Sequence, residues 1–145
     1  MSYAKTHDPR QIIISALGID WIGPADGVFA KITPPADGFK TEIGGQGDVV
    51  RLLSADNRHM LEITLQAASP TNDLADAYYE ADRAGDTTLD RSVQIKDLNG
   101  TSVFSSDAGW IMNKPEVEYG TEGGTRVWKI ECASADNKIR GKNDL

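Results

Sequence analysis

A chain of 145 residues, with 39% hydrophobic and 26% charged residues, has the size and composition of a single globular domain. Its formal net charge of −7 argues against a protein that grips nucleic acid, because such proteins need a basic surface to neutralise phosphates. The single cysteine, Cys132, cannot form an internal disulfide, and no apolar run reaches membrane-spanning length. We therefore expect one domain over residues 1–145 that works in a cytoplasm and not in a membrane.

The first half of the chain predicts short strands that are separated by turn residues. Residues 1–10 are polar and are expected to form an arm. The predicted strands cover residues 11–15, 17–21, 28–33, 49–54 and 59–68. Proline and glycine clusters predict a long loop over residues 33–48, within which residues 39–43 could resume a strand. In the strand at 59–68, the pattern points Leu61, Ile63 and Leu65 to one face.

One segment, residues 70–84, predicts an α-helix on the flank of the β-structure. Ser69 is a suitable cap, Pro70 suits the first helical position, and Gly85 suits a left-handed end. The apolar stripe of this helix is expected to consist of Leu74, Ala77, Tyr78 and Ala81. The opposite face is acidic apart from one arginine, and consists of Asp73, Asp76, Glu80 and Arg83. The like-charged pair Asp76 and Glu80 is best tolerated in water or against a basic partner.

The second half of the chain predicts further strands at residues 91–97, 110–112 and 126–133. Asn99-Gly100 predicts a hairpin with a type I′ turn, which would place Ile95 opposite Phe104. In the same way, Val117 and Tyr119 are expected to face Trp128 and Ile130 across a glycine-rich connection. Trp128, Ile130 and Cys132 are expected to share one face of the last strand. Residues 134–145 are polar and predict a tail.

These elements together predict a mainly-β fold, a barrel or sandwich of about eight to ten short strands with one flanking helix. Closure into a barrel would also remove exposed strand edges, which promote aggregation.

No pattern in the chain predicts a catalytic, cofactor-binding or metal site. His7 and His59 are far apart and lack the paired soft ligands of a zinc site, so a hydrogen-bonded histidine is the better interpretation of His59. Glycine-rich residues 44–47 lack the lysine of a phosphate loop, and are interpreted as a connection that becomes ordered against a partner. Trp21, Trp110 and Trp128 could line a ligand pocket, but tryptophans on strands more often belong to the core. We therefore do not expect an enzyme.

Several segments, in order, resemble the tail tube proteins of contractile-tailed bacteriophages. These are residues 47–51, residues 68–74 after the long strand, residues 93–101, Trp110-Ile111 followed by Lys114-Pro115, and Gly120 with residues 124–132. The resemblance covers nearly the whole chain, from Tyr3 to about Ala133, and matches least distinctly in the N-terminal third.

The resemblance implies a structural virion protein without catalytic residues. Six copies would join their sheets into a ring, and rings would stack into a hollow tube inside the contractile sheath. The implied partners are further copies of the chain, the tail sheath protein, the tape-measure protein, and the baseplate and tail terminator proteins. DNA would pass through the lumen without specific binding. The implied location is the virion tail, after assembly in the cytoplasm of the host bacterium.

The residues themselves agree with this implication at two points. Six copies, each at −7, would carry about −42, and an acidic lumen would let DNA slide without sticking. The segment 33–48 is long enough to bridge subunits or rings, and we expect it to become ordered on assembly. Two alternatives stay open: the tube of a phage-derived tail-like particle or injection system, and a monomeric β-barrel that binds a ligand through its tryptophans.

Overall fold

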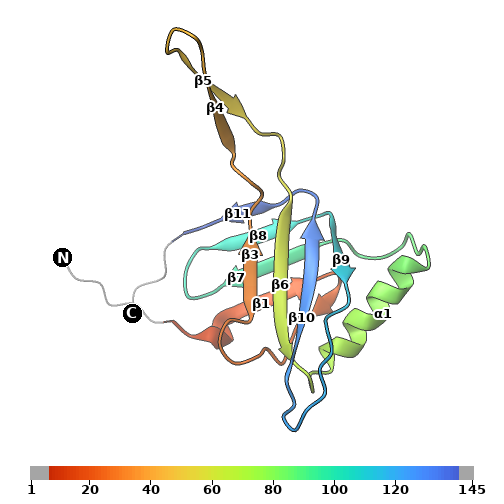
Figure 1. Ribbon diagram of the computed structural model, residues 1–145. Helices are drawn as coiled ribbons and strands as arrows, with labels where there is room; N and C mark the ends of the chain where they lie inside the picture. Colours follow the sequence, from red (N-terminus) through yellow and green to blue (C-terminus); the bar gives the residue numbers. More distant parts are fainter. Residues whose placement is uncertain (1–6, 141–145) are drawn as a thin grey trace, which may run out of the picture.

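The computed structural model describes residues 7–140, and residues 1–6 and 141–145 lie outside this range. Two antiparallel sheets face each other, and a separate two-stranded hairpin projects from them (Figure 1). One α-helix lies at the side of the sheets. The predicted class, mainly β with one flanking helix, is confirmed.

The strands of the two sheets cross one another rather than run side by side (Figure 1). The first sheet has the order β11-β8-β7-β1-β2, with β1 at Ile12–Ala16, β2 at Ile19–Asp20, β7 at Val93–Asp97, β8 at Val103–Ser106 and β11 at Asp136–Lys138. The second has the order β3-β6-β10-β9, with β3 at Ala30–Thr33, β6 at His59–Gln66, β9 at Gly109–Asn113 and β10 at Thr125–Cys132. The remaining elements are η1 at Pro9–Gln11, β4 at Phe39–Ile43, β5 at Val49–Leu53 and α1 at Thr71–Arg83.

The core lies between the two sheets and follows the alternation in the sequence. In β6, Leu61, Ile63 and Leu65 are at most 1% exposed, as predicted. The antiparallel neighbour β10 buries Trp128, Ile130 and Cys132 on its inner face, which also confirms the prediction. The first sheet covers them with Ile14, Val93, Ile95 and Phe104. Each such side chain stabilises the fold by about 1.5–3 kcal/mol through burial.

The ends of α1 are formed by the residues that the sequence indicates. The Ser69 hydroxyl oxygen accepts a hydrogen bond from the Thr71 N–H (3.3 Å), which satisfies a backbone donor of the first turn. Gly85 has a φ of +90°, and the Asp86 N–H donates to the Ala81 carbonyl at 3.1 Å. This is a Schellman ending, which requires a left-handed residue at the position of Gly85.

The predicted inward stripe of α1 is wrong in its rotation about the helix axis. Of Leu74, Ala77, Tyr78 and Ala81, only Tyr78 is buried, and Leu74 is 55% exposed. The residues that are buried are Thr71, Ala75 and Tyr78. Hydrogen bonds select this face: the Thr71 hydroxyl accepts from the Ile22 N–H at 3.1 Å, and the Tyr78 hydroxyl donates to the Asp90 carbonyl at 2.6 Å. The apolar pattern does not carry that information.

The β7–β8 hairpin has the predicted register but not the predicted turn. Ile95 lies opposite Phe104, as expected. Neither Asn99 nor Gly100 has a positive φ, so the type I′ prediction is wrong. The Asn99 side chain is instead held by two segments, since its amide nitrogen donates to the Asp8 carbonyl (2.9 Å) and to the Asp97 carboxylate (2.8 Å).

A two-residue turn with positive φ at both positions occurs instead between β1 and β2. Leu17 and Gly18 have φ values of +59° and +74°, and Ala16 pairs with Ile19 across them. The Leu17 side chain is 3% exposed, so its burial offsets the cost of this backbone conformation.

Residues 114–124 form a loop, so the predicted pairing of Val117 and Tyr119 with β10 is wrong. Val117 is 50% exposed and Tyr119 is 93% exposed. The partners of β10 are β6 and β9, with Trp128 opposite Ile63. β10 therefore has β6 on one side and β9 on the other, so neither of its edges is open to residues 114–124.

Three predicted irregular segments contain regular structure. The long loop predicted at 33–48 contains β4, which pairs with β5, because residues 39–43 resume a strand after the prolines. The tail predicted at 134–145 contains β11, which pairs with β8. Residues 141–145 of this tail lie outside the described range. In the predicted arm, residues 1–6 also lie outside that range, and the 3₁₀ helix η1 begins at Pro9. The Asp8 N–H donates to the Asn99 side chain at 2.9 Å, so the end of the arm is docked.

Candidate assembly interface

The β4–β5 hairpin stands away from the body of the protein (Figure 1). All ten residues of β4 and β5 are exposed. Six of them are large apolar side chains: Phe39, Ile43, Val49, Val50, Leu52 and Leu53. An isolated two-stranded hairpin is marginally stable in water, and exposed apolar clusters of this kind mark interaction surfaces.

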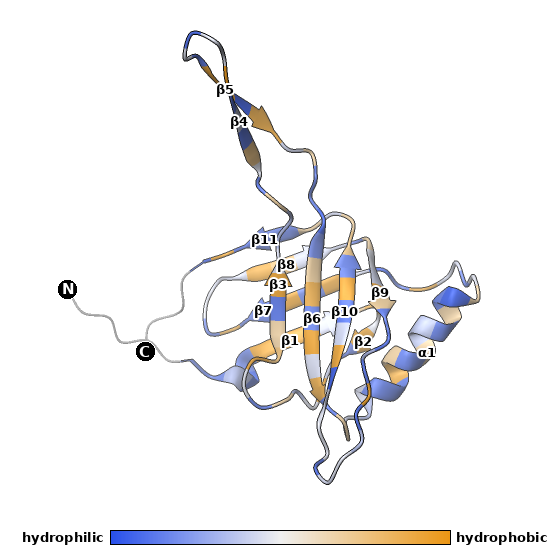
Figure 2. Ribbon diagram, in the orientation of Figure 1, coloured by the Kyte–Doolittle hydropathy of each residue, from blue (hydrophilic) through white to orange (hydrophobic). Residues whose placement is uncertain are grey.

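The register of the hairpin sorts its side chains into two unequal faces. Phe39 pairs with Leu53, and Ile43 pairs with Val49, so these four apolar side chains share one face. The Arg51 guanidinium lies over the Phe39 ring on this face, 4.3 Å from its centroid. The other face mixes charged and apolar residues, namely Lys40, Glu42, Val50 and Leu52. Figure 2 shows both hydrophobic and hydrophilic segments in the hairpin.

The base and the tip of the hairpin are closed by backbone hydrogen bonds. At the base, the Ser54 N–H donates to the Gly38 carbonyl at 2.9 Å. At the tip, the Gly44 N–H donates to the Asp48 carbonyl at 2.8 Å, and Gly47 has a φ of +87°. The glycine-rich residues 44–47 therefore form the turn that joins β4 to β5.

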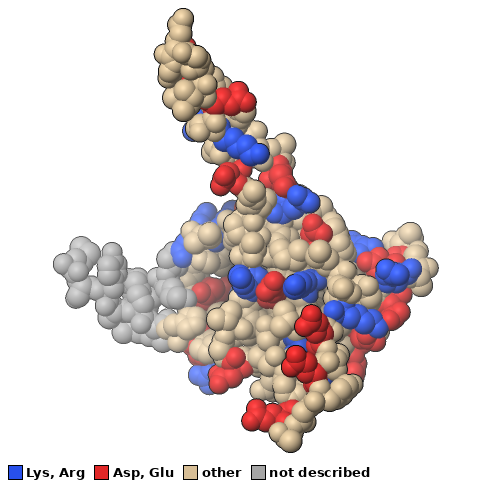
Figure 3. Space-filling view, viewed as in Figure 1, with Lys and Arg blue, Asp and Glu red and all other residues tan. Residues whose placement is uncertain are grey.

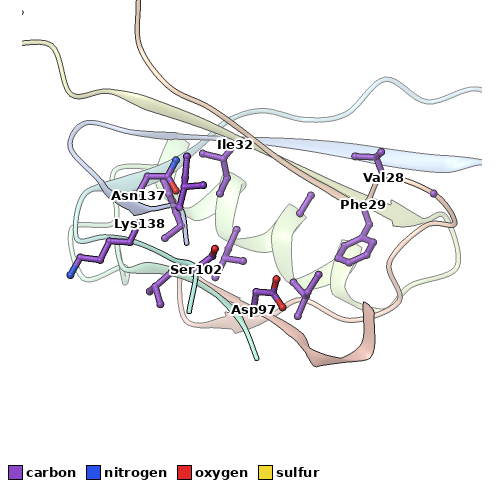
Figure 4. Close-up of a pocket in the computed structure, with 14 residues that line it drawn as sticks. Val28, Phe29, Ile32, Asp97, Ser102, Asn137 and Lys138 are labelled. Carbon is purple, nitrogen blue, oxygen red and sulfur yellow. The ribbon is translucent and has the colours of Figure 1, made fainter. Parts of the chain in front are cut away.

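An apolar groove with a volume of about 410 Å³ lies where the open edges of the two sheets approach each other (Figure 4). Its apolar lining comes from segments that are far apart in the sequence, and includes Ile12, Val28, Phe29, Ile32, Ile95, Val103, Phe104 and Ile139. Two charged residues, Asp97 and Lys138, complete the lining together with a few polar ones. The groove is accessible at its rim, since Val28 is 77% exposed and Ile139 is 83% exposed.

The outward face of the second sheet carries charges of alternating sign. Lys31, Glu62 and Lys129 occupy neighbouring positions across β3, β6 and β10. Figure 3 shows this row of basic and acidic side chains across the middle of the view. The alternation places Glu62 between two lysines, which permits cross-strand attraction within the row.

The loop at 114–124 is fastened to α1 through one lysine. The Lys114 ammonium pairs with the Asp76 carboxylate at 2.8 Å and also contacts the Glu80 carboxylate. The hydrogen bond to Asp76, and to a lesser extent the one to Glu80, raises the pKa of Lys114. The like-charged pair on the helix thus has a basic partner within the same chain.

The histidine and tryptophans that the sequence offered as candidate site residues are held by packing and hydrogen bonds within the fold. The His59 ring is 7% exposed, its Nδ1 lies 3.0 Å from the Asn57 carbonyl oxygen, and it packs edge-on against Phe104. Trp21 and Trp128 are buried and pack edge-on with ring centroids 6.4 Å apart, which confirms their place in the core. Trp110, on β9, is half-buried and is not part of the buried core. Within residues 7–140, no group of three His, Cys, Asp or Glu residues is arranged to hold a metal ion.

Two further properties concern the described part of the chain as a whole. None of its helices has the length and apolar character needed to cross a membrane. Burial raises the pKa of the Cys132 thiol, which keeps this side chain in its neutral form inside the core.

Sequence reasoning found the segment of the hairpin but missed the groove. The groove is assembled from residues in β1, β3, β7, β8 and β11, so no local pattern marks it. The signal that was available is the apolar residue Ile139 in a stretch predicted to be a polar tail.

Comparison with known proteins found a similarity in sequence to a phage structural protein and a similarity in fold to solved structures. No family model matches the chain. The chain is 25% identical over 138 residues to the structural protein ORF10 of Pseudomonas phage KPP10, an alignment that covers 90% of this chain and 79% of that protein. Solved structures share its fold, among them two proteins that terminate tubes.

The first of these is the tube-terminating cap of the anti-feeding prophage, with a TM-score of 0.65 and 8% identity over 97% of this chain and 95% of the other. The second is the sheath/tube terminator of the extracellular contractile injection system PVC in its extended state, with a TM-score of 0.60 and 11% identity over 95% of this chain and 100% of the other. The chain therefore has a fold found in terminators of contractile systems, and is similar in sequence to a phage structural protein.

Proposed function

We propose that the protein is a structural subunit of the tail tube of a contractile phage tail, in which copies form rings that stack around a lumen for DNA. The observation that carries this proposal is the projecting β4–β5 hairpin, whose ten residues are all exposed and mostly apolar. The shared fold with terminators of contractile systems and the sequence similarity to a phage structural protein support the same role.

The physical reason is that the hairpin has no stabilising partner within residues 7–140 beyond its own two strands. Its apolar side chains gain free energy only when another surface removes them from water, at about 25 cal/mol for each Å². A copy of the same chain is the partner that is always present during assembly. Repeated self-association of this kind builds rings and stacks.

The proposed assembly is a ring of six copies, stacked inside the contractile sheath. Its further partners are the sheath, tape-measure, baseplate and tail terminator proteins, and its place is the virion after assembly in the host cytoplasm. The subunit acts by shape and association, without a catalytic step. The tube of a phage-derived tail-like particle would use the same subunit contacts.

A second candidate function, the terminator that ends the tube, is favoured by the two solved structures that share the fold. In both roles we expect this chain to form a ring. They differ in whether a ring accepts a further ring of its own kind.

Negative-stain electron microscopy of the purified full chain across a concentration series tests both functions. Hollow tubes that lengthen with concentration are expected for a tube subunit. Rings that never lengthen would assign the terminator role instead. Single small particles at every concentration would contradict both roles and favour the monomeric ligand-binding barrel.

A further inference from the structure

We propose that the β4–β5 hairpin of one copy docks in the apolar groove of a second copy, with the Phe39, Ile43, Val49 and Leu53 face toward the groove. The inference rests on the proposed function and deepens it, because it names the two surfaces that meet. The proposed function rests on the exposure of the hairpin. This inference also names the surface that receives the hairpin, which is formed by residues of β3, β7, β8 and β11.

The hairpin does not occupy the groove of its own chain. None of its residues is among those that line the groove, and Figure 1 shows it pointing away from the two sheets. The hydrogen bond between Ser54 and Gly38 closes the base of the hairpin. The hairpin is therefore available to another molecule, and so is the groove.

The walls of the groove suit an incoming strand. Among the described residues, β3 pairs only with β6, and β11 pairs only with β8, so each wall ends in a free strand edge. Between these edges the lining is mostly apolar and includes Ile95 and Phe104, which are 8% and 1% exposed. A strand that lies along such an edge gains backbone hydrogen bonds, and its alternate side chains are buried on the floor.

The two surfaces are both neutral within an acidic chain, so they do not repel each other. The hairpin, residues 39–53, carries two basic and two acidic side chains, and the groove carries one of each, Lys138 and Asp97. Both surfaces are thus neutral overall, although the whole chain carries −7. Arg51, at the middle of the apolar face, is the cation that can meet the Asp97 carboxylate in the groove of the next copy.

The contact would join copies head to tail, because the hairpin and the groove are different parts of the surface. Such a contact leaves one hairpin and one groove open in every dimer, so association continues until a ring closes or a stack grows. A contact between identical patches would stop at the dimer. This difference provides the test.

The test uses two variants that each lack one surface. In the hairpin variant, residues 39–53 are replaced by a short Gly-Ser connection between Gly38 and Ser54, which already lie within hydrogen-bonding distance. In the groove variant, Val28→Glu and Ile139→Glu place charges at two exposed rim positions. The matched control is Leu74→Glu, an exposed leucine of α1 outside both surfaces.

Sedimentation velocity measures the mass of each protein alone and of an equimolar mixture of the two variants. We expect each variant to remain a monomer alone, and the mixture to form a 1:1 dimer with no larger species. Leu74→Glu is expected to assemble like the wild type. Thermal melting checks that the variants are folded; if the double groove variant melts early, Ile139→Glu replaces it.

Failure of this inference is distinguishable from failure of the proposed function. A mixture that stays monomeric while the wild type assembles overturns the docking inference and leaves the tube function standing. A groove variant that assembles like the wild type also overturns the docking inference and leaves the tube function standing. It would mean that the hairpin docks on another surface. A wild type that is monomeric under all conditions contradicts both.

Discussion

Arg91 fastens the end of α1 to the chain that leads into β7. Its two terminal nitrogens donate to the two carboxylate oxygens of Asp82 at 2.9 and 2.8 Å, a bidentate geometry. The side chains are 34% and 26% exposed, so solvent weakens the pair without abolishing it. The hydrogen bond from Arg91 lowers the pKa of Asp82 below its ordinary value. The pair therefore stabilises the fold in a way that depends on pH.

We predict that Asp82→Asn lowers the free energy of unfolding by about 1 kcal/mol at pH 7. Because the folded pKa of Asp82 is lowered, its contribution is fully present above the unfolded pKa of about 3.8 and is lost as the pH falls through the folded pKa. The difference between wild type and variant should therefore shrink below pH 4 in urea titrations. Asp20→Asn, at an exposed position of β2, is the control and should change little. An equal deficit at pH 3 and pH 7 would contradict the ion-pair explanation.

At the scale of elements, the hairpin is separable from the body. Excision of residues 39–53 is expected to move the thermal midpoint by only a few degrees, since all ten strand residues are exposed and the excised ends are adjacent. Differential scanning calorimetry measures this midpoint. Leu61→Ala in β6 serves as a reference for real core damage and should cost about 2–5 kcal/mol. A loss of comparable size on excision would show that the hairpin stabilises the body.

Elements could be predicted from the sequence where one side of a segment is buried. The alternation of Leu61, Ile63 and Leu65 reports the core directly, and β6 was predicted with its correct inner face. The pairing of β4 with β5 could not be predicted in this way, because no residue of either strand is buried. The turn at Asn99 was predicted wrongly because its side chain binds Asp8, which is 91 positions away in the sequence.

The candidate interface was predictable only in part, because one of its two surfaces is formed by strands that are far apart in the sequence. The loop predicted at 33–48, interpreted as a bridge between copies, contains β4 and the turn of the hairpin, while β5 was predicted as a separate strand. The groove depends on the crossing of two sheets and on β11, a short strand of polar residues that no alternation reveals. Surfaces that arise from long-range pairing have no local signature.

At the scale of the whole molecule, charge opposes the assembly that we propose. Each copy carries −7, while the hairpin and the groove are neutral, so the repulsion comes from the rest of the surface. Screening acts over about 30 Å at 0.01 M salt and about 8 Å at 0.15 M. Neighbouring copies should therefore repel each other strongly only at low ionic strength.

We predict that the critical concentration for assembly falls several-fold when NaCl is raised from about 0.01 M to about 0.15 M, because screening removes repulsion between acidic copies while the apolar contact is kept. Pelleting assays measure this concentration. Replacing Glu116, Glu118 and Glu122 by Gln in the exposed loop changes the net charge from −7 to −4, and should reproduce part of the salt effect at 0.01 M. The hairpin-excised variant should not assemble at either salt concentration. A critical concentration that rises with salt would mean that ion pairs hold the copies together, and would contradict an apolar contact between hairpin and groove.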